Sequence, residues 1–453
     1  MNKKIAVLVK IYKGDLNPFD ECALECALSF DNADITVIAM SPLVYKETLE
    51  SVTRLGCNAI LISDPLYAGS DTIATSKVLA KALNKLNPDL IFCGRQSVDG
   101  DTGQVPSMIS ELLGYGLFNK VMDINHENVT LRNGNTVLID KKQIFTFEKF
   151  KLLRSPSIFS KKKEITIWNN NDLNLLKEEV GQLGSPTKVI KSYQNYTDRR
   201  FCSFIEYKDL DEIVNKSLIN NNLEKERHIN KAPLIHYIGN IKNIAEKYGE
   251  KSQEIDVENL SVSDICQKIK ELKPHIIFWE ENEKYKPLAA RVAISLNIGL
   301  CADCTDFDNK DGKFVITRPA LGGDIFADII CDSAISMATV RNVSEQKENV
   351  AITVGRGAIK YLDKIQRLAD RYNAKIYCSR PIADEGLLDY SKQVGLTGIV
   401  INPKVCITIG TSGAVQHMVG INKSQTIIAI NINKKEKVFD YANYGIIMDA
   451  MNI

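Results

Sequence analysis

A strand, a tight turn and a helix are predicted in one stretch, Val405-Cys406-Ile407-Thr408-Ile409-Gly410-Thr411-Ser412-Gly413-Ala414-Val415-Gln416-His417-Met418-Val419-Gly420. An apolar β-rich run ends at Gly410, and Gln416 and His417 stand on the first turn of the predicted helix. Such a junction offers unpaired backbone N–H groups and a positive dipole end, which suit a pyrophosphate. An ordinary turn capped by Thr411 or Ser412 has the same pattern, so the stretch alone leaves both interpretations open.

The region around this stretch predicts a βα domain. Strands are expected at residues 351–355, 375–379, 405–409 and 426–431. Each ends next to polar or glycine residues, which are Arg356, Ser379 with Arg380, Thr411 with Ser412, and Asn431. Ligands bind at the carboxyl ends of strands in open α/β sheets, so this convergence predicts a dinucleotide site.

The first part of the chain also alternates β-rich runs with helical patterns. Strands are expected at residues 5–12, 34–40, 59–63 and 89–94. Such alternation implies a mostly parallel sheet covered on both faces. Polar alternating runs at residues 130–139 and 146–150 predict appended antiparallel strands.

A second candidate site follows the fourth of these strands, in Gly94-Arg95-Gln96-Ser97-Val98-Asp99-Gly100-Asp101-Thr102-Gly103-Gln104-Val105-Pro106. The glycines and Thr102 could cradle a phosphate on backbone N–H groups, whereas Asp99 and Asp101 would repel one. A nucleotide resolves this conflict, because its ribose hydroxyls or adenine amine can donate to the carboxylates. An acidic turn with Asp101 or Thr102 as helix N-cap is the alternative, and the pattern leaves both open.

The second half of the chain repeats the first. Pro88-Asp89-Leu90-Ile91-Phe92 corresponds to Pro274-His275-Ile276-Ile277-Phe278, and residues 112–117 correspond to residues 296–300. The second copy has Glu280-Glu281-Asn282-Glu283-Lys284 in place of the glycine-rich loop. Only the first copy is therefore expected to hold a nucleotide.

These patterns predict an α/β fold of three βα domains with mostly parallel sheets, two of them related copies and the C-terminal one doubly wound. The length of 453 residues suits about three domains. The predicted division is 1–219 with a C-terminal arm, a linker at 220–231, a second domain at 232–345 and a third at 346–453.

Composition narrows the functional classes. With 57 basic and 56 acidic residues the net charge is +1, which gives no electrostatic argument for nucleic-acid binding. The N-terminal apolar run is broken by Lys10 and Lys13, so neither a signal peptide nor membrane insertion is expected. Eleven cysteines lie mostly singly in apolar runs, which indicates a cytoplasmic protein. Cys301 and Cys304 have C-x-x-C spacing without a second pair, so no metal site is predicted.

Together the motifs resemble those of the electron transfer flavoprotein family, with a β-subunit-like half fused before an α-subunit-like half. The β-like motifs are Asn17-Pro18-Phe19-Asp20-Glu21, the loop 94–106 and Gly184-Ser185-Pro186-Thr187. The α-like motifs are Thr317-Arg318-Pro319-Ala320-Leu321-Gly322-Gly323, Met337-Ala338-Thr339-Val340-Arg341, Gly355-Arg356-Gly357, Ser379-Arg380-Pro381, Gln393-Val394-Gly395-Leu396-Thr397-Gly398 and the opening stretch.

The resemblance implies that the C-terminal domain binds FAD. Arg380 would place its guanidinium against the isoalloxazine, Thr397 would hydrogen-bond near N5, and His417 would donate to the pyrimidine carbonyl. A cation and donors at these places would stabilise negative charge on a reduced flavin. The implied contacts are Arg356, Ser379, Arg380, Val394, Gly395, Leu396, Thr397, Ser412, Gly413, Ala414, Val415, Gln416, His417, Asn431 and Asp449.

The resemblance further implies a second nucleotide, either AMP or a second FAD, in the first domain. Its expected contacts are Leu8, Asn17, Pro18, Phe19, Asp20, Ser97, Val98, Asp99, Gly100, Asp101, Thr102, Gly103, Gln104 and Val105.

Three functions remain open on the sequence. The preferred one is an FAD electron carrier that serves protein partners such as an acyl-CoA dehydrogenase-like flavoenzyme or a ferredoxin-type protein. The second is an electron-bifurcating, NADH-oxidising flavoprotein with two FADs. The third is an adenine-nucleotide-binding module with a decayed flavin site, because Leu396 replaces the family's usual glutamine and residues 11–16 are shorter than the hairpin usual in the family.

Overall fold

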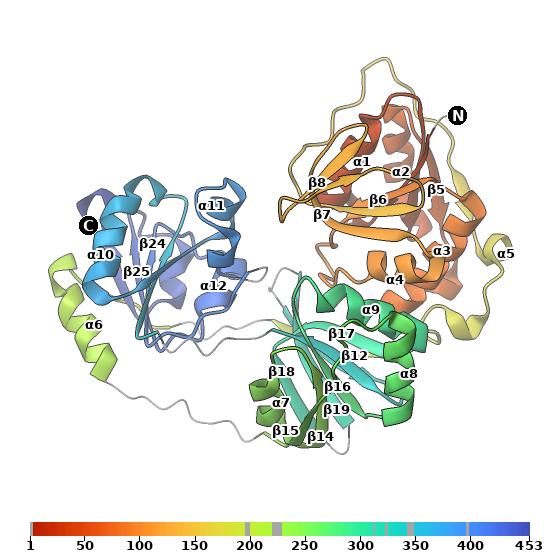
Figure 1. Ribbon diagram of the computed structural model, residues 1–453. Helices are drawn as coiled ribbons and strands as arrows, with labels where there is room; N and C mark the ends of the chain where they lie inside the picture. The colour runs from red at the N-terminus through yellow and green to blue at the C-terminus, as the bar shows by residue number, and fades with distance from the viewer. Residues whose placement is uncertain are drawn as a thin grey trace. The chain divides into compact units, whose positions relative to one another are not determined.

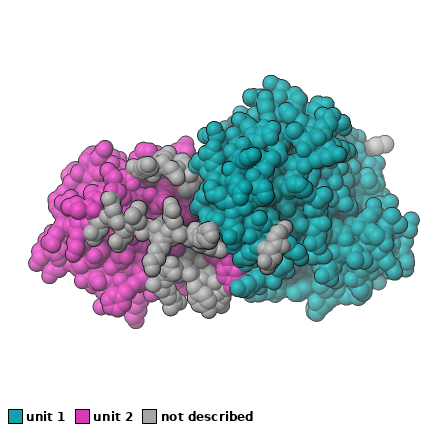
Figure 2. All heavy atoms as spheres, turned by 90° about the horizontal axis from the view of Figure 1, so that it is seen from below, with its two compact units in different colours: residues 1–192, 229–321, 327–341 teal, residues 193–228, 322–326, 342–453 magenta. Residues whose placement is uncertain are grey.

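The computed structural model describes residues 3–194, 200–219, 229–310, 313–321, 325–341, 348–395 and 398–453. The chain forms two compact units, which Figure 2 colours separately. Unit 1 contains residues 1–192, 229–321 and 327–341, and unit 2 contains residues 193–228, 322–326 and 342–453. Most of the predicted linker, residues 220–228, lies outside the described residues, and so do Leu396 and Thr397.

The first domain of unit 1 is built on a nine-stranded sheet with the order β11-β5-β4-β1-β6-β10-β7-β8-β9 (Figure 1). Its strands are β1 Lys3–Val9, β4 Ala33–Met40, β5 Asn58–Ile62, β6 Leu90–Gly94, β7 Gly116–Ile124, β8 Asn128–Leu131, β9 Thr136–Leu138, β10 Gln143–Phe147 and β11 Thr166–Trp168. Its helices are α1 Pro18–Leu28, α2 Lys46–Val52, α3 Thr72–Leu86, α4 Val105–Leu113 and α5 Asn170–Leu173. A small hairpin, β2 Ile11–Tyr12 and β3 Asp15–Leu16, follows β1.

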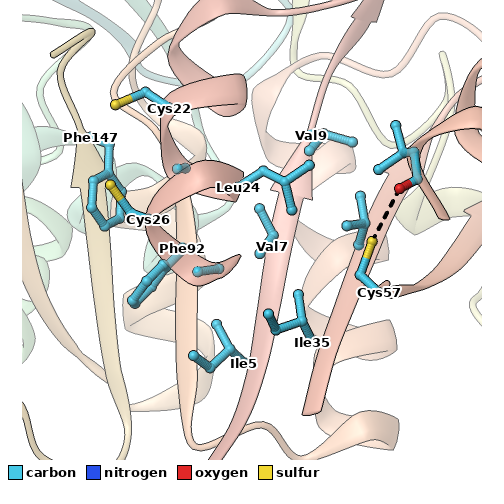
Figure 3. Packing of buried hydrophobic residues seen from close by; sticks show 14 of the residues in the cluster. Ile5, Val7, Val9, Cys22, Leu24, Cys26, Ile35, Cys57, Phe92 and Phe147 are labelled. Atoms are coloured by element: carbon cyan, nitrogen blue, oxygen red, sulfur yellow. Dashed lines mark hydrogen bonds between the residues drawn. The ribbon is translucent and has the colours of Figure 1, made fainter. Parts of the chain in front are cut away.

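Both faces of this sheet are covered by helices. Ile5 and Val7 of β1 pack with α1 and α2, and Ala6 and Leu8 pack with α3 and α4 on the other face. Figure 3 shows Leu24 of α1 beside Val7. Strands buried on both faces need continuous apolar runs rather than alternation, and β1 has such a run.

The edge beyond β7 tests the antiparallel prediction. Strands β8 and β9 pair antiparallel, as predicted for residues 130–139. The prediction for residues 146–150 was wrong, because β10 lies inside the sheet and pairs parallel with β6 and β7. Thr146 made this strand look half-polar, but its buried Oγ1 accepts a hydrogen bond from Lys120 N at 2.9 Å.

The second domain repeats the centre of the first. Its five-stranded sheet has the order β15-β14-β16-β21-β17, which corresponds to β4-β1-β6-β10-β7. Thr146 pairs with Cys93 in the first sheet as Thr339 pairs with Trp279 in the second, so the two registers agree. This confirms the predicted copies. The elements are β14 Ala232–Ile238, β15 Gly249–Glu254, β16 Ile276–Glu280, β17 Gly299–Cys304, β21 Ser336–Val340, α7 Lys242–Tyr248, α8 Val262–Leu272 and α9 Tyr285–Leu296.

A four-stranded sheet with the order β12-β20-β19-β18 joins segments from both halves of the chain. Strand β12 follows the first domain in the sequence, and the other three strands are inserted between β17 and β21. Their bounds are β12 Thr187–Gln194, β18 Asp306–Lys310, β19 Lys313–Ala320 and β20 Ile325–Cys331.

The C-terminal domain has a six-stranded parallel sheet with the order β13-β26-β25-β24-β22-β23 (Figure 1). Its five C-terminal strands follow the doubly wound order 2-1-3-4-5, whose switch point lies between β22 and β24. Strand β13 and helix α6 come from the predicted arm of the first domain, yet they pack in unit 2. The elements are β13 Ser203–Phe204, β22 Val350–Val354, β23 Lys375–Cys378, β24 Val405–Ile409, β25 Thr426–Asn431, β26 Tyr444–Ile447, α6 Leu210–Ile219, α10 Leu362–Tyr372, α11 Arg380–Asp384 and α12 Val415–Ile421.

Among the described residues, no helix is both long enough and apolar enough to cross a bilayer.

Candidate functional site

A cavity of about 950 Å³ opens in unit 1 at the carboxyl ends of β1, β4, β5 and β6. The loop after β6 forms one wall, and residues after β4 and β5 form another. Leu300, Ala302 and Arg318 add a wall from the second copy and its inserted sheet. The volume lies near the upper end of the range of about 300–1,000 Å³ that is usual for small-molecule sites.

Several buried polar atoms at this cavity have no hydrogen-bond partner among the described residues. They are Oδ1 of Asn17, Oδ1 of Asp99, and Nε and Nη2 of Arg318. Arg318 is only 5% exposed. Buried polar groups are normally satisfied, and leaving one unpaired is costly, so these atoms point to a polar ligand. A cation, an amide oxygen and a carboxylate together match the mixed donors and acceptors of a nucleotide.

Two acidic side chains at the cavity have opposite pKa shifts. Burial raises the pKa of Asp20 to about 7, although its oxygens accept hydrogen bonds from Lys10 N at 2.7 Å and Gly94 N at 2.8 Å. Burial also acts to raise the pKa of Asp99, but the Lys10 ammonium 3.2 Å away and hydrogen bonds from Ser97 and Gly100 together outweigh it, so the pKa is lowered. Asp99 is therefore a stable acceptor at neutral pH.

Most of the residues predicted for the second nucleotide line this cavity. The ten that do are Leu8, Asn17, Asp20, Ser97, Asp99, Gly100, Thr102, Gly103, Gln104 and Val105. The other four, Pro18, Phe19, Val98 and Asp101, are described residues that lie outside the lining. Phe19 packs under the Arg95 guanidinium, whose carbon is 4.8 Å from the ring centroid. Asp101 accepts a hydrogen bond from Gln96 Nε2 at 2.7 Å, so it shapes the loop.

Other lining residues had not been assigned a binding role from the sequence. The sequence shows Arg318 only within a motif, and it carries no local signal for the segments after β4 and β5, residues 40–43 and 62–65. The ends of β4 and β5 lie on the same sheet edge as the end of β6, so strand order would have indicated these segments. Arg318 is distant in sequence, and its position depends on the inserted sheet.

The C-terminal domain places its predicted contacts along one edge of its sheet. Residues 355–357 follow β22 and residues 410–414 follow β24, so both loops flank the switch point. The loops are in close contact, because a β-carbon on Gly355 would lie 2.2 Å from Gly410 O. Gly413 has φ +78, and a β-carbon there would lie 2.1 Å from Val438 N. These positions need glycine because neighbouring protein backbone occupies the space that a β-carbon would take, so the two loops are held in close-packed shapes at the sheet edge.

His417 is buried in the first turn of α12. Its Nε2 lies 3.4 Å from Thr353 Oγ1, and its Nδ1 has no hydrogen-bond partner among the described residues. Burial lowers the pKa of His417 to about 4. The imidazole is therefore neutral at physiological pH and can donate one N–H to a ligand.

The remaining predicted contacts differ in exposure and in the protein contacts that they make. Arg356, Ser412, Ala414 and Gln416 are exposed, and Ser379, Val394, Gly395 and Val415 are at least half-buried beside them. Three others make protein contacts. Arg380 Nε lies 3.1 Å from Asp384 Oδ2, Asn431 Nδ2 donates to Thr411 O at 2.8 Å, and Asp449 caps the last turn through Met451 N. Leu396 and Thr397 lie outside the described residues, so their predicted contacts stay predictions.

Cys301 and Cys304 are buried free thiols. Within the described part of the chain, no group of three or more His, Cys, Asp or Glu side chains is arranged to hold a metal ion.

The fold defines a class: α/β proteins with a duplicated βα core and a doubly wound domain arranged as in dinucleotide-binding proteins. The electron transfer flavoprotein domain matches residues 5–146 and 261–363, and the electron transfer flavoprotein FAD-binding domain matches residues 345–422. The chain belongs to the electron transfer flavoprotein family, with a β-subunit-like half followed by an α-subunit-like half.

Relatives match both kinds of subunit. The chain is 34% identical over 201 residues to electron transfer flavoprotein subunit beta of Thermoanaerobacterium thermosaccharolyticum, covering 41% of this chain and 77% of that protein. It is 32% identical over 235 residues to subunit alpha of the same organism, covering 42% and 71%. It is 30% identical over 227 residues to Protein FixB of Rhizobium meliloti, covering 40% of this chain and 64% of that protein.

Proposed function

We propose that this chain is an FAD-containing electron carrier whose flavin is held on the C-terminal domain. The observation that carries the proposal is the sheet edge at the switch point of β22 and β24. There, residues 355–357 and 410–414 form two loops with positions that only glycine can occupy. The buried His417 follows the second loop, and its Nδ1 is unpaired among the described residues. The match of residues 345–422 to an FAD-binding domain supports the same ligand.

The residues at this edge have separate roles in the proposal. Backbone N–H groups of residues 412–414 hold the pyrophosphate, because Ser412 and Ala414 are exposed just before the first turn of α12. His417 donates a hydrogen bond to the flavin ring from a water-excluded position. Arg380 supplies a positive charge, and its contact with Asp384 fixes the guanidinium. FAD supplies the redox chemistry when it is bound, and a nearby cation and neutral donor favour negative charge on the reduced ring.

Reconstitution tests the proposal. Purified full-length protein is incubated with FAD, freed of excess ligand, and assayed for bound flavin by its visible absorption. His417→Ala is expected to weaken FAD binding about ten-fold, because one hydrogen bond in a buried site is lost. The matched control is Gln425→Ala, which changes an exposed residue shortly after the same helix that is not among the predicted flavin contacts. A protein that binds no flavin after reconstitution would overturn the carrier and leave an adenine-nucleotide-binding module.

A second candidate is an electron-bifurcating, NADH-oxidising flavoprotein with a second FAD in the unit 1 cavity. The specific observation in its favour is the cavity of about 950 Å³, which extends beyond the 97–104 loop to the segments after β4 and β5. AMP would occupy only part of such a space. The unpaired Arg318 and Asn17 atoms fit a nucleotide of either size.

Ligand counting separates the two candidates. One FAD with one AMP per chain supports the simple carrier, and two FADs per chain support the bifurcating protein. Anaerobic NADH should bleach the flavin only in the second case. One FAD, one AMP and no response to NADH would exclude the bifurcating candidate.

For the partners we propose a flavoenzyme of the acyl-CoA dehydrogenase type or a ferredoxin-type protein. We also propose a cytoplasmic location, since all eleven cysteines are free thiols and most are buried. Mixing the flavin-loaded protein with each reduced partner and following flavin absorption would identify the donor.

A further inference from the structure

The loop that forms one wall of the cavity is supported from behind by the second copy. Gln104 Nε2 donates to Leu300 O at 3.3 Å, and Leu321 N donates to Asp99 O at 3.2 Å. Between these contacts the chain turns through Gly103, which has φ +62. A β-carbon placed on Gly103 would lie 3.1 Å from Arg95 O and 3.7 Å from Lys286 Cε, so the lysine stem lies beside this turn.

Lys286 is held by two carboxylates. Its Nζ lies 2.6 Å from Glu281 Oε1 and 3.2 Å from Asp303 Oδ2, and Asp303 also pairs with Arg341 at 3.1 Å. The four side chains, Glu281, Lys286, Asp303 and Arg341, form what we call the brace cluster. They are between 11% and 23% exposed, and their formal charges cancel.

The charge states in the brace cluster are mutually dependent. Burial acts to lower the pKa of Lys286, but the two carboxylates outweigh it and the pKa is raised. Burial likewise acts to raise the pKa of Asp303, but Lys286 and Arg341 lower it. Lys286 is thus charged and anchored at neutral pH, which restricts its stem to one position.

We infer that Lys286 is a positioning residue for the unit 1 nucleotide site: anchored by Glu281 and Asp303, its stem holds the Gly103 turn so that the 97–104 loop keeps its ligand-binding shape. Lys286 itself is outside the cavity lining in the described residues. The inference rests on the proposed nucleotide site for its functional meaning, while the loop-holding role is a property of the ligand-free chain.

A charge-balanced double variant tests this role. Lys286→Ala with Glu281→Gln removes the stem and one opposite charge together, so no carboxylate is left buried without its cation. The matched control is Lys284→Ala with Glu258→Gln, which removes an exposed pair from the start of the same helix. Lys286→Met with Glu281→Gln is the gentler variant, because it keeps a stem of similar length without the anchor.

The first measurement is amide hydrogen exchange of residues 97–104 in ligand-free full-length protein. Asp101 N, which donates to Ser97 O at 3.0 Å, reports on the closed loop. We expect exchange to accelerate about ten-fold in the Ala variant and about three-fold in the Met variant, with the control unchanged. Loop exchange that matches wild type in both Lys286 variants would overturn the inference, whatever the protein binds.

The second measurement is AMP affinity of FAD-loaded full-length protein by calorimetry. We expect the Ala variant to bind AMP about ten-fold more weakly and the control to bind like wild type. Wild-type protein that binds neither AMP nor a second FAD would refute the nucleotide site, and loop exchange would still decide the role of Lys286. Unchanged affinity despite faster loop exchange would overturn the functional part of the inference.

Discussion

The two copies of the βα core in unit 1 satisfy the same backbone group in different ways. In the first copy, Lys10 N after β1 donates to the carboxylate of Asp20, which comes from α1. In the second copy, the equivalent Asn240 N after β14 donates to Glu280, which stands at the end of β16. Both copies therefore place a carboxylate over the end of the first strand. They differ in the element that supplies it.

The element that supplies the carboxylate also affects whether the sheet edge is open or covered. Glu280 occupies the position of Gly94, since each follows the strand residue that pairs with Thr146 or Thr339. At Gly94 the space is taken by α1, and the sheet edge in front stays open as the cavity. Glu280 instead folds over Gly239 in its own copy. The strand-end residue is thus one of two differences at this edge, and the glycine-rich loop after β6 is the other.

Equivalent positions around the two sheet edges carry side chains of opposite charge. Lys120 and Asp303 occupy equivalent left-handed positions, with φ 62 and 56, and each donates its N–H to a threonine Oγ1 at 2.9 Å. The first copy has Arg95, Lys120 and Glu148, and the second has Glu281, Asp303 and Arg341 at the same places. The backbone is shared because it depends on main-chain hydrogen bonds, while opposite charges need only be paired.

The largest expected effect comes from giving the first copy the residue of the second. In Gly94→Glu, the new β-carbon would lie 2.4 Å from Asp20 Oδ1 and 2.6 Å from Phe19 Cβ. Overpacking and an unpaired buried charge should lower the free energy of unfolding of unit 1 by about 5 kcal/mol. Urea denaturation measures the loss. A variant with wild-type stability would contradict the argument that Gly94 is fixed by the position of α1.

A smaller effect is expected from inverting one buried ion pair. Arg95 Nε lies 3.0 Å from Glu148 Oε2, and both side chains are less than 10% exposed. Arg95→Glu should cost about 3 kcal/mol of unfolding free energy, because two buried carboxylates then face each other. Adding Glu148→Arg restores an opposite-charge pair in the order of Glu281 and Arg341, and it should recover part of the loss, since Arg132 then faces the new arginine. A double-mutant cycle with strictly additive effects would contradict the proposed pairing.

The pH dependence of the free energy of unfolding should reveal the raised pKa of Asp20. Burial raises the pKa of this carboxyl to about 7 in the folded protein, above its ordinary value of 3.8. Between about pH 4 and pH 7 the Asp20 carboxyl is therefore protonated in the folded protein but ionised in the unfolded chain. The stability that this proton contributes is complete below about pH 4 and is lost as the pH rises through 7. We expect unfolding free energy to fall by about 2 kcal/mol from pH 5 to pH 8.

Asp20→Asn is the control for this pH effect, because it cannot titrate. Urea denaturation of both proteins from pH 5 to pH 8 gives the comparison. Parallel pH profiles would show that Asp20 has an ordinary pKa in the folded protein.

The smallest effect is expected from the converse substitution in the second copy. Glu280→Gly removes the hydrogen bond from Asn240 N at 3.0 Å and should cost about 1 kcal/mol of unfolding free energy. It should not create nucleotide binding, because the edge still lacks the glycine-rich loop. Calorimetry that counts the AMP bound per chain, in Glu280→Gly and in the wild-type protein, measures this. A second AMP bound in the variant would show that one residue is enough to open a site.

Much of the architecture was readable from the sequence. Parallel strands such as β1 and β24 are buried on both faces, so their continuous apolar runs identify them locally. The repeat was visible because Phe92 and Phe278 stand in matching apolar runs that a shared sheet position requires. Strand β10 was misassigned, because the polar Thr146 conceals a central strand when its hydrogen bond to Lys120 is not known.

The candidate sites also have features that the local sequence shows and features that depend on long-range contacts. The sequence by itself determined the fold class, the duplicated core and the loops at residues 97–104 and 410–417, since these depend on apolar runs, glycines and strand ends that are local in the chain. Only the tertiary structure decided that Arg318 reaches the cavity and that Lys286 packs behind Gly103. It also decided that His417 is buried with an unpaired Nδ1 among the described residues. Those properties arise from contacts between residues far apart in the sequence, and local sequence patterns carry no record of such contacts.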